Sequence, residues 1–271
     1  MGLRINPRLI IGLLIALGSL FTYFTSRQYN PITDETQHVA ISPRQEIALG
    51  LQAAPQMAAQ HGGISSDERA RALVDRVGRQ VVARSAASKS PYRFEFHLLA
   101  DPETINAFAL PGGQVFITEG LLRRLGSEGQ LAGVLGHEVG HVVARHSAEH
   151  MAKQRLTEGL TGAAVLATYD PSDPRTMRNA AVAALIANMV NMKFGRDDEI
   201  EADRLGVKFM AEGGYDPRAM IGVMEVLAKA TGGNRQPEFF STHPNPERRM
   251  ERIQEAIRRE FPQGVPSGLK S

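Results

Sequence analysis

The stretch GVLGHEVGHVV, residues 133–143, is the part of this sequence that decides its interpretation. On a helix, His137 and His141 share one face about one turn apart and can bind one metal ion together. Glu138 lies beside this pair, where a carboxylate can take a proton from a zinc-bound water and pass it to a leaving amine. The pattern HExxH therefore predicts a zinc site with Glu138 as a catalytic residue.

The residues around this motif favour that interpretation over a chance match on a solvated helix. The neighbours are valines, leucines and glycines, which is the composition of a buried helix. Three polar side chains on such a helix need hydrogen-bond partners or a metal. Ser127 and Gln130 match a capping box, so the helix that carries the motif is expected to begin near Ser127.

A third zinc ligand must come from elsewhere in the chain. Catalytic zinc usually has three protein ligands, and His146 does not have the spacing of an extended motif. The chain contains no cysteine, which leaves His and carboxylates. In the acidic run DDEIEAD, Glu199 and Asp203 share one helical face, whereas Glu201 projects from the other side. Glu199 is the candidate ligand, with Asp203 as its neighbour that orients a ligand histidine. An acidic first turn that only complements the helix dipole is the alternative.

The remaining periodicity predicts a mainly α-helical protein with a small β-sheet. Phe94, Phe96 and Leu98 alternate with polar residues, as in a half-buried strand. Pro111-Gly112-Gly113 separates two short apolar runs, which indicates a hairpin whose second strand is Val115–Thr118. Further helices are expected after Ser42, over 65–85 with Ser66 as cap, over 197–212, over 217–230 and from about Pro246. The apolar stretch 156–192 is expected to form a helical insertion without an assigned role.

Length and charge limit the functional classes. With 271 residues, 42% of them hydrophobic, the chain can bury one good-sized core. Residues 43–271 are therefore expected to form one catalytic domain. The net charge is only +2 and the basic residues are scattered rather than gathered in a stripe, so nucleic acid is not an expected partner.

The N-terminal segment predicts a membrane anchor. Leu9–Ser26 carries no charge and, as a helix with about 1.5 Å per residue, spans roughly 27 Å, close to the thickness of a bilayer core. Arg4 and Arg8 precede it, so the rest of the chain is expected outside the cytoplasm. Residues 1–28 are interpreted as a retained single-pass signal-anchor and residues 29–42 as a tether. A cleaved signal peptide, which would release the protein into the periplasm, is the alternative.

Three ordered motifs resemble metallopeptidase family 48 over about residues 42–257. They are HExxH, EIEAD at 199–203 and NAFALPGG at 106–113. The family includes HtpX-like quality-control proteases, CAAX prenyl-proteases and periplasmic protein-quality peptidases. A single anchor departs from the first two branches, so the resemblance favours the periplasmic type, bound to the cell inner membrane.

The resemblance also implies a fold and a site. The fold is that of a gluzincin, mainly helical with a small sheet, and it holds one Zn²⁺ on His137, His141 and Glu199. Glu138 is the general base, and Asp203 lies behind the ligands. These roles imply a zinc metalloendopeptidase. A membrane-tethered, zinc-containing binding module that resembles a chaperone and turns over little substrate is the competing hypothesis.

Asn106, Ala107 and Phe108 are expected to lie on an edge strand near the cleft. An extended polypeptide could add to that edge as a further strand, although a purely structural hairpin is the alternative. Backbone pairing of this kind is largely independent of sequence. It therefore suits substrates that are unfolded or misassembled proteins.

His243, in the segment STHPNPERRM, is the second candidate catalytic residue. Pro244 and Pro246 restrict the backbone around it, and related periplasmic members carry a His-Pro segment here that can approach the metal. His243 is predicted to occupy the water position on zinc in a resting state and to move aside for substrate. Whether it gates the site or stabilises the transition state is left open, and a histidine on a surface loop is the alternative. Arg248 or Arg249 is expected to assist with the oxyanion.

Overall fold

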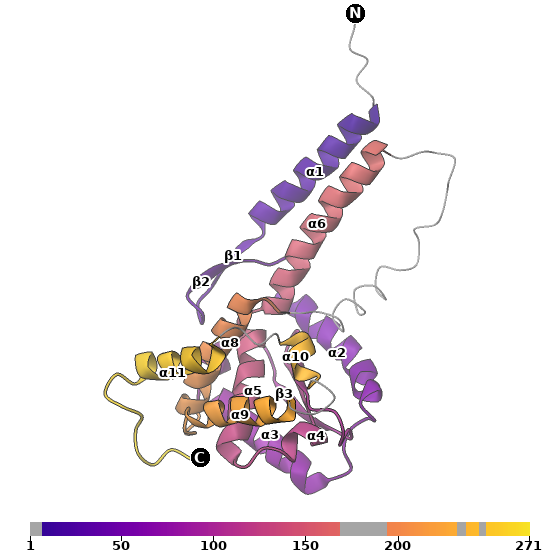
Figure 1. Cartoon of the computed structure of the whole chain (residues 1–271). Helices are drawn as coiled ribbons and strands as arrows, with labels where there is room; N and C mark the ends of the chain where they lie inside the picture. The colour runs from indigo at the N-terminus through magenta and orange to yellow at the C-terminus, as the bar shows by residue number, and fades with distance from the viewer. Residues whose placement is uncertain (1–6, 169–193, 232–236, 244–247) are drawn as a thin grey trace, which may run out of the picture.

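The computed structural model describes residues 7–168, 194–231, 237–243 and 248–271 (Figure 1). It is mainly helical with a small sheet, as the sequence predicts. The helices are α1 (Pro7–Thr25), α2 (Pro43–Gln60), α3 (Glu68–Ala83), α4 (Glu119–Leu122), α5 (Glu128–Val143), α6 (His146–Thr168), α8 (Arg196–Glu212), α9 (Ala219–Thr231), α10 (Phe239–Thr242) and α11 (Arg249–Glu260), with a 3-10 turn at Ala86–Lys89. The strands are β1 (Arg27–Asn30), β2 (Glu35–His38), β3 (Glu95–Leu99), β4 (Ala107–Leu110) and β5 (Gln114–Thr118).

The sheet beside the core has three strands in the order β3-β5-β4. β3 runs parallel to β5, and β4 pairs antiparallel with β5 through the predicted hairpin. The turn depends on glycine, because Gly112 has a φ of +85° and a Cβ there would lie 2.4 Å from the Cα of Ile47. β4 is consequently an edge strand of this sheet.

α5 lies at the centre of the protein and is buried along almost its whole length. Ser127 caps it by accepting a hydrogen bond from the backbone N–H of Gln130. The capping box is incomplete, because the Gln130 side chain bonds the N–H of Gly126 instead. Two glycines of α5 let α8 approach closely. A Cβ on Gly140 would lie 3.0 Å from the carbonyl oxygen of Ala202, and one on Gly136 would lie 3.2 Å from that of Gly206.

α1 is the one helix in the described part of the chain that is long and apolar enough to cross a membrane. It spans 19 residues with a mean hydropathy of 1.7, and most of its side chains are exposed. α1 lies alongside α6, and the two helices project together from the rest of the molecule (Figure 1). These features agree with the predicted anchor in length and composition.

Much of the segment 29–42, which was expected to be a tether, has regular structure, because residues 27–38 form the hairpin of β1 and β2. Two buried amide side chains explain why this polar segment is ordered. Asn30 donates a 2.8 Å hydrogen bond to the carbonyl of Val143, and Gln37 donates one to the carbonyl of Ala144. The hairpin therefore supplies donors for the last carbonyls of α5, which the helix itself cannot satisfy.

Three expected helix boundaries also need correction. α3 is capped by Asp67 rather than Ser66, because the Asp67 carboxylate accepts from the N–H of Ala70. α9 begins at Ala219, two residues after the expected Pro217. α11 begins at Arg249 and not near Pro246, which lies outside the described residues. Of the predicted insertion 156–192, the part up to Thr168 belongs to α6, and residues 169–193 are not described.

Candidate metal centre

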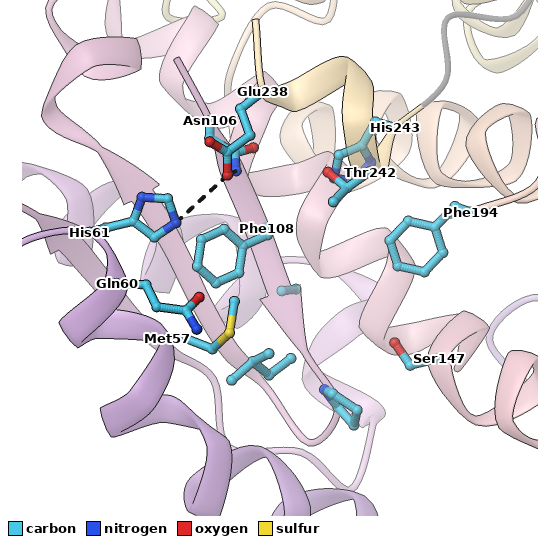
Figure 2. A pocket seen from close by; sticks show the side chains of 13 residues that line it. Met57, Gln60, His61, Asn106, Phe108, Ser147, Phe194, Glu238, Thr242 and His243 are labelled. Carbon is cyan, nitrogen blue, oxygen red and sulfur yellow. Dashed lines mark hydrogen bonds and ion pairs between the residues drawn. The ribbon is translucent and has the colours of Figure 1, made fainter. Parts of the chain in front are cut away.

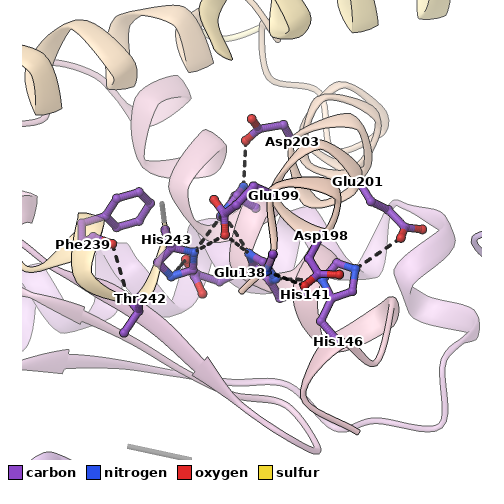
Figure 3. Close-up of polar contacts among 12 residues, drawn as sticks. Glu138, His141, His146, Asp198, Glu199, Glu201, Asp203, Phe239, Thr242 and His243 are labelled. Carbon is purple, nitrogen blue, oxygen red and sulfur yellow. Dashed lines mark hydrogen bonds and ion pairs between the residues drawn. The ribbon is translucent and has the colours of Figure 1, made fainter. Parts of the chain in front are cut away.

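Four buried side chains from three parts of the chain converge beside the sheet. His137 and His141 come from α5, Glu199 comes from α8, and His243 follows α10 (Figure 3). One ligand atom from each lies within 4.8 Å of the other three. The structure therefore brings together the residues that the sequence predicts as zinc ligands and the loop histidine that is predicted to reach them.

The distances within this cluster match the needs of a small cation. The Nε2 atoms of His137 and His141 are 3.0 Å apart. The carboxylate oxygens of Glu199 lie 3.3 Å from Nε2 of His141 and 3.5 Å from Nε2 of His137. Among the described residues, Oε2 of Glu199 and Nε2 of His243 have no hydrogen-bond partner, although both are buried. Unpaired buried polar atoms are costly, so a ligand is expected here. Two imidazoles and one carboxylate are a common donor set of catalytic zinc.

Asp203 holds His137 in the orientation that this site requires. Its Oδ1 lies 2.9 Å from Nδ1 of His137, which leaves Nε2 to face the cluster. Arg249 is buried beside it and donates two 2.8 Å hydrogen bonds to the Asp203 carboxylate. Nη1 of Arg249 also lies 3.1 Å from Oε2 of Glu199, in a contact that is not aligned as a hydrogen bond. Arg249 thus offsets the charge of two carboxylates, whereas Arg248 is exposed.

Glu138 adjoins the cluster without joining it. Its two carboxylate oxygens are buried and, among the described residues, have no hydrogen-bond partner. The nearest partner of opposite polarity is Nε2 of His243, 3.5 Å from Oε1. This arrangement places an unengaged carboxylate next to the site where the ligand atoms converge.

Burial and neighbouring charge act differently on the groups of the site. Burial lowers the pKa of His141 well below its usual range, which favours the neutral, metal-binding form. Burial alone would raise the pKa of Glu199, but His243 and His141 hold it well below its usual range. Burial raises the pKa of Glu138, and the charges of His243 and His137 only partly oppose this. Glu199 is therefore suited to bind a cation, and Glu138 to accept and return a proton.

Several residues of the site were not predicted. Phe194 stacks on His141, with ring centroids 4.0 Å apart, and Phe239 stacks on His243 at 4.4 Å. His146 lies behind His141, with the two Nδ1 atoms 2.8 Å apart, and Nε2 of His146 lies 3.2 Å from Oε2 of Glu201. The sequence carries no local signal for this role, because His146 stands between Arg145 and Ser147 in a polar segment. Glu201 lies outside the ligand cluster, as expected, but it contacts the cluster through His146.

A narrow cleft leads along β4 to His243 (Figure 2). Asn106 and Phe108 line it, whereas Ala107 is buried and does not; of the three residues expected on the edge strand, Ala107 and Phe108 lie on β4. Asn106 precedes β4 by one residue and donates a 3.2 Å hydrogen bond to Glu238. The remaining lining mixes apolar and polar side chains and comes from α2, β4 and its turn, the start of α6, α10 and Phe194.

The edge of β4 that faces away from β5 carries the backbone groups of Ala107 and Ala109, of which Ala107 is fully buried and Ala109 is partly exposed. The N–H of Thr118 donates to the carbonyl of Asn106, so hydrogen-bonded pairs in this antiparallel ladder recur at Phe108 and Leu110. The alternate residues, Ala107 and Ala109, then point their N–H and C=O groups away from β5. No backbone partner outside the sheet binds either residue within the described part of the chain.

Comparison with known proteins shows the relationships of this chain. Peptidase family M48 matches residues 68–257. Mitochondrial metalloendopeptidase OMA1 from Schizosaccharomyces pombe is 34% identical over 259 residues, which covers 92% of this chain and 73% of that protein. Beta-barrel assembly-enhancing protease from Escherichia coli is 31% identical over 183 residues, which covers 65% of this chain but only 37% of that relative. The family match spans the three motifs and the whole metal centre described above, and the chain belongs to peptidase family M48.

Proposed function

We propose that this protein is a membrane-anchored zinc metalloendopeptidase that cleaves unfolded or misassembled proteins. The observation that carries the proposal is the convergence of His137, His141 and Glu199 beside Glu138, a buried carboxylate without a hydrogen-bond partner among the described residues. The three converging residues would hold one Zn²⁺. The named relatives, which are a metalloendopeptidase and a protease, support the same reaction class.

The roles of the protein's own groups follow from their positions. Zinc, when bound, supplies a Lewis acid that polarises a carbonyl and lowers the pKa of water. Glu138 accepts a proton from the attacking water and returns it to the leaving amine, for which its raised pKa is suited. Asp203 keeps His137 turned toward the cluster, and Arg249 keeps Asp203 ionised. Phe194 and Phe239 cover the histidine rings and limit the access of water.

The test of this function is hydrolysis of unfolded casein by the purified full chain in detergent. Cleavage is expected to stop on chelation of the metal and to return when zinc is added. The competing function, a chaperone-like module, predicts that casein is bound and never cut, whether or not zinc is present. Binding of casein without cleavage, by protein that holds one zinc per chain, would overturn the proposed enzymatic function.

We further propose that an extended substrate pairs with the open edge of β4. Ala109→Pro should lower kcat/KM for casein by about tenfold, because each lost hydrogen bond to substrate costs roughly 0.5–1.5 kcal/mol. The internal ladder should survive, because the N–H of Ala109 points away from β5. Zinc content, fold and cleavage are measured together for this variant.

The matched control for the edge strand is Ala109→Val, which adds bulk at the same position but keeps the N–H. This variant should remain within a small factor of the wild type. An equal loss of kcat/KM in both variants would mean that the added side-chain bulk, and not the missing backbone hydrogen bond, weakens substrate binding.

His243 is proposed to gate the site. Its Nδ1 lies 2.9 Å from Oε1 of Glu199, and its Nε2 lies toward Glu138, so it occupies space that water and substrate require. His243→Ala should therefore retain zinc and raise cleavage by about two- to tenfold, if a minor fraction of the wild type is open at a given time. Casein cleavage and bound zinc are compared with those of His97→Ala, a histidine on β3 outside the site. Lower cleavage with zinc retained would show that His243 stabilises the transition state instead.

The anchor and its side of the membrane are also proposals. α1 would cross the inner membrane once, with the catalytic part on the periplasmic side, because Arg4 and Arg8 precede the apolar stretch. One of the two named relatives is a mitochondrial protein, and the other comes from a bacterium. A reporter fused after Ser271 should report a location outside the cytoplasm, and a cytoplasmic signal would reject this topology.

A further inference from the structure

We infer that His146 and Glu201 form a positioning arm that fixes the tautomer of His141 and so sets the zinc affinity of the site. This inference rests on the proposed zinc function. It assigns a role to two residues that are not members of the ligand cluster. Both lie behind His141, on the side away from Glu199 (Figure 3).

The arm is built from the junction of α5 and α6. Arg145 adopts a left-handed φ of +58° between the two helices, which interrupts the helical path between the end of α5 and the start of α6. This strained residue is held by Glu46, whose Oε2 accepts hydrogen bonds of 3.0 and 2.8 Å from its guanidinium. His146, the first residue of α6, is consequently turned under the ring of His141 and is fully buried.

Among the arrangements with one proton on each histidine ring, one satisfies all three groups. His141 directs Nε2 toward Glu199 and His137, so that atom must be free of hydrogen to bind a metal. Its proton then lies on Nδ1, which donates to Nδ1 of His146 across 2.8 Å. His146 must in turn carry its own proton on Nε2, which donates to the Glu201 carboxylate across 3.2 Å.

The opposite arrangement would disable the ligand. If Nδ1 of His141 accepted a hydrogen bond from His146, the neutral His141 ring would carry its proton on Nε2 and point it into the cluster. His146 would then present an unprotonated Nε2 to Glu201, and two acceptors would face each other. The carboxylate of Glu201, which also lies 3.6 Å from Arg204, therefore selects the metal-binding tautomer through His146.

The two ligand histidines are thus supported by two carboxylates of the same helix. Asp203 contacts His137 directly, whereas Glu201 projects from another side of α8 and reaches His141 only through the His146 ring. The alternation in the EIEAD sequence supplies one metal ligand, Glu199, and one supporting carboxylate for each histidine. Glu201 reaches His141 only through His146, which contacts both residues.

Paired substitutions at His146 test the arm through zinc affinity, measured by chelator competition on the full chain. His146→Leu removes the acceptor and should weaken zinc binding by about 10- to 100-fold. His146→Asn places a carbonyl oxygen near the position of Nδ1 and should restore the affinity to within about threefold of the wild type. Equal affinities of His146→Leu and the wild type would overturn the inference, as would equal losses in the Leu and Asn variants.

A second pair at Glu201 keeps the test valid if the buried His146 variants fail to fold. Glu201 is partly exposed, so Glu201→Ala should fold, and it should weaken zinc binding because His146 loses its acceptor. Glu201→Gln retains an acceptor oxygen and should lose less affinity than the Ala variant. An unchanged affinity in Glu201→Ala would reject the arm.

The tautomer can be observed without any metal, by ¹⁵N NMR of the histidine rings in the metal-free protein. His141 should carry its proton on Nδ1 in the wild type and lose this preference in His146→Leu. A wild type that shows this tautomer but binds no zinc would reject the proposed function and retain the arm. Zinc binding by a wild type whose His141 carries the proton on Nε2 before the metal is added would reject the arm and retain the function.

Discussion

Glu138→Gln is expected to abolish peptide-bond cleavage while one zinc per chain remains bound. The carboxylate lies beside the converging ligand atoms, but it is not one of them. Glutamine preserves the size of the side chain and removes the group that accepts the proton. Loss of a general acid-base residue typically lowers the rate by about 10²- to 10⁴-fold. The measurement is the casein cleavage rate together with metal content.

The control for this prediction is Glu251→Gln, which changes an exposed glutamate of α11 that contacts Arg248. It should leave both cleavage and zinc unchanged. Residual cleavage by Glu138→Gln at more than about one tenth of the wild-type rate would mean that another group accepts the proton. Loss of zinc in Glu138→Gln would instead place Glu138 among the ligands, against the geometry described here.

Glu199→Ala is expected to remove the metal and, with it, all cleavage. Glu199 supplies the carboxylate of the three-residue donor set. Burial alone would raise its pKa, but its neighbours, His243 first among them, hold the pKa well below its usual range. The site therefore stabilises the charged form of Glu199. Without it, two imidazoles remain and the positive Arg249 loses a partner 3.1 Å away. Zinc affinity should fall by at least about 100-fold, more than for any supporting residue behind the ligands.

Asp197→Ala is the matched control, because Asp197 belongs to the same acidic run but is exposed at the first turn of α8. It should bind zinc like the wild type. Metal analysis of both variants after dialysis distinguishes a ligand from a charge that only complements the helix terminus. Full zinc retention by Glu199→Ala would disprove the proposed ligand set.

The metal centre could be predicted from the sequence to the extent that helical periodicity fixes it. The spacing of His137 and His141 and that of Glu199 and Asp203 each specify a shared helix face, and α5 and α8 bring these faces together. The hairpin turn at Gly112 was predictable for a similar reason, because its chemistry is local. His243 needed the family resemblance in addition, since nothing local shows where a loop folds.

What the sequence did not reveal depends on tertiary contacts. The polar residues 27–38 carry no strand periodicity, and their order comes from Asn30 and Gln37 bonding the end of α5. His146 lacks the spacing of a ligand, and its place beside His141 depends on the left-handed residue Arg145 between the two helices. Phe194 lies far from His141 in the sequence, so their stacking could not be inferred from any local pattern.

The β1–β2 hairpin has a consequence for which polypeptides the active site can meet. His38 stacks on Tyr23 near the end of α1, and the N–H of Val39 donates to the carbonyl of Ser26, while Asn30 bonds the end of α5. If α1 lies in the bilayer, these contacts hold the catalytic centre at a fixed height above the lipid surface, because the segment that connects it to α1 is not a flexible linker. Chains that emerge from or lie on the same membrane then encounter it at a high effective concentration, whereas chains free in bulk solution do not.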